Sequence, residues 1–94
     1  MEDFGAGAIR LMRAIKLRHQ VIEAGMAVDP YTSALDVGLP VDSPSYGAAL
    51  DELVDAYVLR RAVEAERLLS NVQGLNPQYE ITTEGARAIN NVGE

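Results

Sequence analysis

Two pairs of a capping residue and a proline, Asp29-Pro30 and Ser43-Pro44, constrain the fold of this chain more than any other feature. Aspartate or serine at the N-cap followed by proline at the first helical position favours a helix start. The side chain of the cap accepts a hydrogen bond from an unpaired amide of the first turn, and proline has no amide hydrogen of its own to leave unpaired. Gly38 ends the first of these helices early. The pattern therefore predicts two helices joined by a tight turn, a helix-turn-helix.

Apolar periodicity predicts helices before and within this unit. One broad stripe at helical spacing indicates a long first helix over residues 8–24, ended by Gly25 in the left-handed conformation. A second stripe predicts the core-facing side of the helix that follows Ser43. Its members are Tyr46, Ala49, Leu50, Leu53, Val54 and Tyr57.

Beyond that helix the apolar residues no longer fall on one face at helical spacing, which predicts an extended segment near residues 58–62. A short helix is expected at 65–72 and a strand at 79–81. Thr82 is the expected N-cap of the last helix, and Gly85 would let that helix approach its neighbours closely. The prediction is one mostly α (α+β) domain over residues 1–94, with a loose N-terminus at 1–7 and a frayed end at 91–94.

Residues 79–89 read aromatic, x, aliphatic, Thr, x, x, Gly and then an apolar helix. Together with Ala-Leu-x-x-Leu-Val at 49–54, this run resembles bacterial winged helix-turn-helix proteins over roughly residues 28–90. The resemblance implies a small two-stranded wing and binding to double-stranded DNA in transcription regulation. The chain departs from the family pattern between residues 57 and 77, where no glycine precedes Gly74. A plain helical bundle is the alternative fold.

The DNA contacts expected from this hypothesis lie on the helix after Pro44 and on the extended segment that follows it. They are Ser43, Ser45, Ala48, Arg60 and Arg61.

Charge argues against DNA binding. With 14 acidic and 8 basic residues, the formal net charge of −6 repels polyanions. Residues 42–57 contain no Lys or Arg, and the expected loop at 72–78 is uncharged. The carboxylates of the first of these segments are Asp42, Asp51, Glu52 and Asp55.

The alternative function is a protein-interaction or dimerisation module. In this hypothesis the long first helix packs against a second copy through apolar residues such as Leu17, Val21 and Met26. The DNA-binding domain is also expected to be a homodimer, formed through its first and last helices. The basic residues of the first helix are interpreted as a solvated surface with paired charges, or else as a secondary site for an anionic partner. They are Arg10, Arg13, Lys16 and Arg18.

The sequence predicts no catalytic, cofactor or metal site. Without cysteine there is no disulfide, thiolate zinc site or cysteine nucleophile. His19, the only histidine, lies on the apolar stripe of the first helix and is expected to be packed and hydrogen-bonded. The tyrosines Tyr46 and Tyr57 are expected in the core rather than stacked on a ligand. The absence of a membrane-length apolar run and of a signal-peptide pattern favours a cytoplasmic protein.

Overall fold

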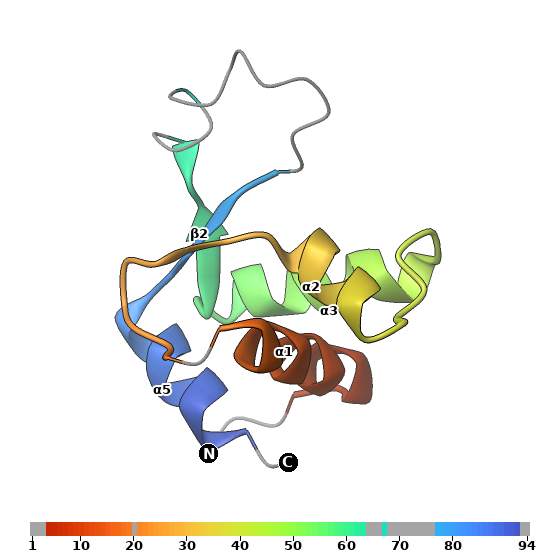
Figure 1. Ribbon diagram of the computed structural model, residues 1–94, viewed down its shortest axis with the longest axis horizontal. Helices are drawn as coiled ribbons and strands as arrows, with labels where there is room; N and C mark the ends of the chain where they lie inside the picture. The colour runs from red at the N-terminus through yellow and green to blue at the C-terminus, as the bar shows by residue number, and fades with distance from the viewer. Residues whose placement is uncertain (1–3, 20, 64–66, 68–76, 93–94) are drawn as a thin grey trace.

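The computed structural model describes residues 4–19, 21–63, 67 and 77–92. This part of the chain is mostly helical with a small antiparallel sheet, so the predicted α+β class is confirmed (Figure 1). The predicted helix at 65–72 and loop at 72–78 lie outside the described residues except for Arg67, Pro77 and Gln78. The elements are α1 (Ala6–Arg18), β1 (Ala27–Val28), α2 (Pro30–Asp36), α3 (Pro44–Asp55), β2 (Leu59–Arg61), β3 (Tyr79–Ile81) and α5 (Thr83–Asn91).

Helix α1 is shorter than predicted and begins earlier, running over residues 6–18 instead of 8–24. The backbone becomes extended at His19, with φ −114° and ψ 117°. Ile22 continues the apolar spacing and is buried, but it lies in an irregular segment after the helix. Asn90 of α5 donates from Nδ2 to the Ile22 carbonyl oxygen at 3.2 Å. Gly25 does adopt a positive φ of 88°, but it forms a turn into β1 and does not cap a helix.

Helices α2 and α3 begin where the two proline pairs predicted. Asp29 caps α2, and its Oδ1 accepts from the amide of Thr32 at 3.1 Å. Ser43 occupies the N-cap position of α3, but its hydroxyl donates to the Pro40 carbonyl oxygen at 2.7 Å instead of accepting from α3. Gly38, with φ 75°, follows the end of α2 and turns the chain towards α3. The starts of α2 and α3 and the turn between them are therefore set by local signals.

The sheet has three strands rather than the predicted two, in the order β1-β3-β2. The extended segment after α3 is confirmed as β2, and it pairs antiparallel with β3, placing Arg60 opposite Glu80 and Arg61 opposite Tyr79. The missed strand β1 pairs with the other edge of β3, with Val28 opposite Tyr79. The β1 strand joins α2 to the strand pair, because α2 follows it directly.

The core lies between α1, the sheet and the inner faces of α3 and α5 (Figure 1). Tyr57 was predicted to be part of it, but this side chain is 74% exposed. Helix α3 ends at Asp55, and Tyr57 takes a left-handed φ of 61° that redirects the chain into β2. The largest fully buried core side chains include Leu11, Ile15, Leu53, Leu59, Ile81 and Ile89.

The junction of β3 and α5 is confirmed as predicted. The Thr82 hydroxyl accepts from the amide of Gly85 at 2.8 Å and donates to the Tyr57 carbonyl oxygen. A Cβ added at Gly85 would lie 1.9 Å from the Val58 carbonyl oxygen, so only glycine fits. This close approach fixes the start of α5 against the turn between α3 and β2.

Candidate functional site

The first half of α3 presents a small, uncharged surface. Ser45 and Ala48 are exposed, whereas Ser43 is half-buried with its hydroxyl bound to Pro40. The first turn holds no acidic residue. Three of the five expected DNA contacts thus lie together at the beginning of this helix, on backbone placed by the Ser43-Pro44 start.

The carboxylates of α3 lie in its second half and differ in their surroundings. Asp51 and Asp55 are exposed. Glu52 was expected on the same solvent face, but it is half-buried and its Oε2 accepts from the amide of Gly5 at 2.8 Å. One of the three carboxylates of α3 therefore attaches the segment before α1 to α3, and its charge is less available to a partner.

The two adjacent arginines of β2, both expected to contact DNA, project from opposite faces of the sheet, because side chains alternate along a strand. Arg60 forms an ion pair with Glu80 of β3, with Nη2–Oε2 at 2.8 Å and Nε–Oε2 at 2.9 Å. The guanidinium carbon of Arg61 lies 5.7 Å from the centroid of the Tyr79 ring. The structure does not bring the two arginines together.

Tyr31 of α2 and Tyr46 of α3 are in ring contact, and Tyr79 of β3 lies near enough to influence Tyr46, a grouping that sequence reasoning did not predict. The rings of Tyr31 and Tyr46 meet edge to face, with centroids 6.2 Å apart and an interplanar angle of 89°. Burial raises the pKa of Tyr46 to about 12, with smaller contributions from Asp29, Tyr79 and Tyr31. Tyr46 was correctly expected to pack on the core, although it is only half-buried. We call Tyr31, Tyr46 and Tyr79 the tyrosine cluster.

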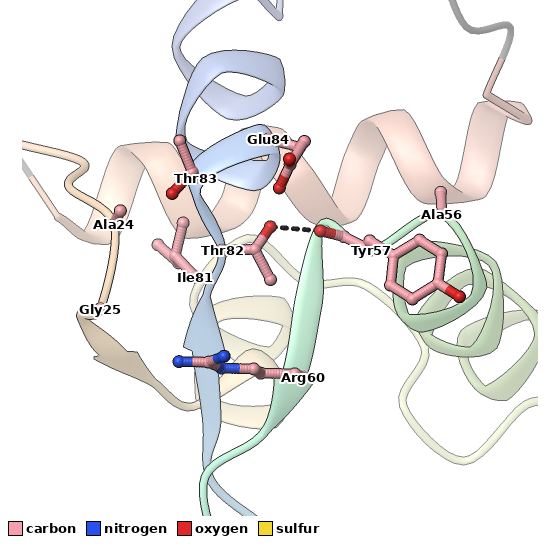
Figure 2. Close-up of a pocket in the computed structure, with 9 residues that line it drawn as sticks. All are labelled: Ala24, Gly25, Ala56, Tyr57, Arg60, Ile81, Thr82, Thr83 and Glu84. Carbon is pink, nitrogen blue, oxygen red and sulfur yellow. Dashed lines mark hydrogen bonds between the residues drawn. The ribbon is translucent and has the colours of Figure 1, made fainter.

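A second feature absent from the sequence reasoning is an open hollow of about 650 Å³ at the base of the sheet. Figure 2 shows Thr82 in its centre and the side chain of Arg60 running across β3. The Thr82 hydroxyl is already engaged by Tyr57 and Gly85. The Thr82 hydroxyl is therefore not free to bind a ligand, and the other polar side chains of the hollow include those of Arg60, Thr83 and Glu84.

Two basic residues of α1 have partners within the chain, as the paired-charge interpretation expected. Arg18 forms an exposed ion pair with Asp36 of α2. Lys16 Nζ donates to the carbonyl oxygens of Asn90 and Val92 at 3.1 and 3.3 Å, at the C-terminal end of α5. That end of a helix favours a cation because its carbonyl groups carry partial negative charge.

The apolar residues expected to pack against a second copy differ in their exposure to solvent. Leu17 is 74% and Val21 62% exposed. Met26, by contrast, is half-buried and packs against the core of its own chain, so that part of the prediction is wrong. Helices α1 and α5 also contact each other within the chain.

His19 was expected to be hydrogen-bonded, and this prediction is wrong. It follows the end of α1, and its Nε2 is buried with no hydrogen-bond partner in the part of the chain that the structure describes. Within that same part, no three His, Asp or Glu side chains gather in a way that would hold a metal ion.

None of the helices in the described ranges has the length and hydropathy needed to span a bilayer. No family model, curated protein or solved structure matches this chain. Its function is therefore inferred from its own residues and geometry.

Proposed function

We propose that this chain is a winged helix-turn-helix domain that binds double-stranded DNA in transcription regulation and has no catalytic role. The observation that carries the proposal is the order of the elements together with the sheet order β1-β3-β2. A helix and a short strand precede two helices joined by a tight turn, and an antiparallel strand pair follows them. In such an arrangement α3 enters a DNA groove and the β2–β3 pair serves as the wing.

The charge distribution along α3 decides how DNA would be approached. Ser45 and Ala48 lie in its uncharged first half, whereas Asp51 and Asp55 lie towards its other end. The unpaired amides of the first turn carry partial positive charge, which favours a nearby phosphate. Entry by the first half of α3 keeps Asp51 and Asp55 away from the DNA backbone, whereas Asp42, which is exposed just before Ser43, would lie near it.

The test is a fluorescence anisotropy titration with random-sequence duplex DNA over about 50 to 200 mM salt. Binding that weakens as salt rises supports the proposal, because each phosphate contact releases a counterion. Ala48→Glu adds a carboxylate to the exposed first half of α3, so we expect it to weaken binding roughly tenfold. Ala24→Glu is the matched control, since Ala24 is exposed in the loop before β1.

Two results would contradict this assignment. One is the absence of any binding at micromolar protein. The other is an equal effect of the Ala48 and Ala24 substitutions, which would mean that net charge alone, and not the face of α3, governs binding.

A second candidate is a protein-interaction or dimerisation module on the same scaffold. The observation that favours it is the exposure of Leu17 and Val21 near the end of α1, combined with the exposed carboxylates Asp51 and Asp55 on α3. Sedimentation of the wild-type chain and of Leu17→Ser tests it. A dimer that Leu17→Ser dissociates supports this candidate, whereas a wild-type mass near 10.1 kDa at high concentration removes the dimer.

A further inference from the structure

The hollow at the base of the sheet is surrounded by separate segments of the chain (Figure 2). Ala24 and Gly25 lie on one side and the turn after α3 on the other, while the start of α5 and the side chain of Arg60 lie at its two ends. A Cβ added at Gly25 would meet nothing within 4 Å, so that side is open. The volume of about 650 Å³ is in the range of pockets that hold small ligands.

Tyr57, which lines this hollow, occupies a backbone position that helices usually give to glycine. The turn after α3 is a Schellman motif, in which the Val58 amide donates to the Leu53 carbonyl oxygen at 2.9 Å. Tyr57 is the left-handed residue of the motif, with φ 61°, a conformation that is unfavourable for any residue with a Cβ. Because its side chain is 74% exposed, packing in the core does not offset this cost. The tyrosine is therefore better explained by a ligand than by folding.

The charges around the hollow favour a cation. Among the residues that the structure describes, Glu84 has no hydrogen-bond or ion-pair partner for its carboxylate. Arg60 also lines the hollow, but its Nη2 and Nε lie 2.8 and 2.9 Å from Glu80 Oε2, so this pair carries no net charge. The unpaired amides at the start of α5 attract an anion, and Glu84 in that first turn already supplies one. The formal net charge of −6 adds to the attraction for cations.

We infer that the hollow binds a small ligand that carries a guanidinium or amidinium group on an apolar body. The N–H donors of such a group match the two oxygens of the Glu84 carboxylate, and its flat face suits the ring of Tyr57. The apolar body meets Ala24, Ala56 and Ile81, which also line the hollow. This site follows the last turn of α3, whereas the proposed DNA contacts of α3 lie in its first half, so the inference does not rest on DNA binding.

The experiment titrates the full chain with benzamidine, an amidinium on a phenyl ring, and follows the backbone amide signals by NMR. We expect the signals of Gly25, Thr83 and Glu84 to shift, with a dissociation constant of about 1 mM for so small a ligand. Benzamide has nearly the same shape without the charge, and benzoate carries the opposite charge. Neither should shift these signals at the same concentrations.

A pair of charge variants tests the role of Glu84. Glu84→Gln removes the carboxylate, and we expect it to weaken benzamidine binding roughly three- to fivefold. Glu23→Gln is the matched control, because Glu23 is exposed in the loop before β1 but does not line the hollow. Its affinity for benzamidine should stay near the wild-type value.

Tyr57→Gly separates binding from folding. Glycine adopts a left-handed φ without a Cβ penalty, so we expect the urea midpoint of this variant to rise or stay unchanged. Loss of the ring should nevertheless weaken benzamidine binding roughly threefold. A clear fall of the midpoint would assign the tyrosine side chain to the fold and overturn its role in binding.

Three further results overturn the inference. One is the absence of any shift at the hollow with benzamidine. Another is binding of benzoate in its place, which would assign the hollow to anions. The third is an equal loss in Glu23→Gln and Glu84→Gln, which would mean that net charge alone attracts the ligand. None of these results bears on the DNA-binding proposal, which the anisotropy titration tests separately.

Discussion

The two ends of the β2–β3 strand pair are held by different kinds of contact. At the base, Thr82 and Gly85 bring the backbone of α5 against the carbonyl groups of Tyr57 and Val58. At the other end, the half-buried rings of Tyr31 and Tyr46 contact each other, and the exposed Arg61 lies over the buried ring of Tyr79. At Gly85 the base has no room for one additional carbon atom, although the hollow beside Thr82 is open, whereas the cluster end leaves polar atoms near the surface. We conclude that backbone packing fixes the base, whereas side-chain contacts hold the cluster end.

The largest expected effect is at the base, for Gly85→Ala. The new Cβ would lie 1.9 Å from the Val58 carbonyl oxygen and 2.7 Å from its carbon, so backbone must move. We expect the free energy of unfolding to fall by about 3 kcal/mol, despite the better helix propensity of alanine. Urea denaturation measures this change.

Gly47→Ala in α3 is the control for that experiment, because nothing lies within 4 Å of a Cβ at Gly47. Alanine there should raise the free energy of unfolding by about 0.5 to 1 kcal/mol. Equal effects at both glycines would show that the base is not tightly packed and would remove the contrast between the two ends.

An intermediate effect is expected for Thr82→Ala. The substitution removes the acceptor of the Gly85 amide and the donor to the Tyr57 carbonyl oxygen. Since Gly85 is buried, its amide would be left without a partner, and we expect a loss of about 2 kcal/mol in the free energy of unfolding. Thr82→Ser keeps the hydroxyl and should retain most of the stability in the same denaturation assay. A loss as large for serine as for alanine would assign the effect to the methyl group instead.

The difference between local contacts and contacts made by distant parts of the chain also explains which features could be predicted from the sequence. Asp29, Ser43 and Thr82 start helices through short-range signals, and all three starts were found where the pattern placed them. The end of α1 was missed because Ile22 continues the apolar spacing after the helix has stopped. Strand β1 has only two residues, which is too few for an alternating pattern to register.

The candidate site was predicted less completely, because its geometry depends on contacts between distant parts of the chain. The positions of Ser45 and Ala48 follow from the start of α3 alone. The separation of Arg60 from Arg61 follows from strand alternation, but the partners Glu80 and Tyr79 are fixed only by the register of β2 on β3. The tyrosine cluster combines three elements, and no local pattern reports that they meet.

The smallest expected effect belongs to the cluster end and appears only at high pH. The folded chain holds the pKa of Tyr46 at about 12, above its ordinary value of 10.0, mainly because burial disfavours the phenolate. The unfolded chain therefore loses this proton first as the pH rises. Stability from this group is complete below about pH 10 and is lost between about pH 10 and 12. Because Tyr46 is half-buried and solvent screens the effect, we expect a loss of about 1 kcal/mol.

Denaturation of the wild type and of Tyr46→Phe from about pH 9 to 12 measures this loss. Phenylalanine keeps the edge-to-face contact with Tyr31 but has no proton to lose, so the variant should decline less steeply with pH than the wild type. Parallel declines would mean that the hydroxyl of Tyr46 is solvated in the folded chain. The cluster end would then be more open than its half-buried rings indicate, and the contrast with the closed base at Gly85 would be larger.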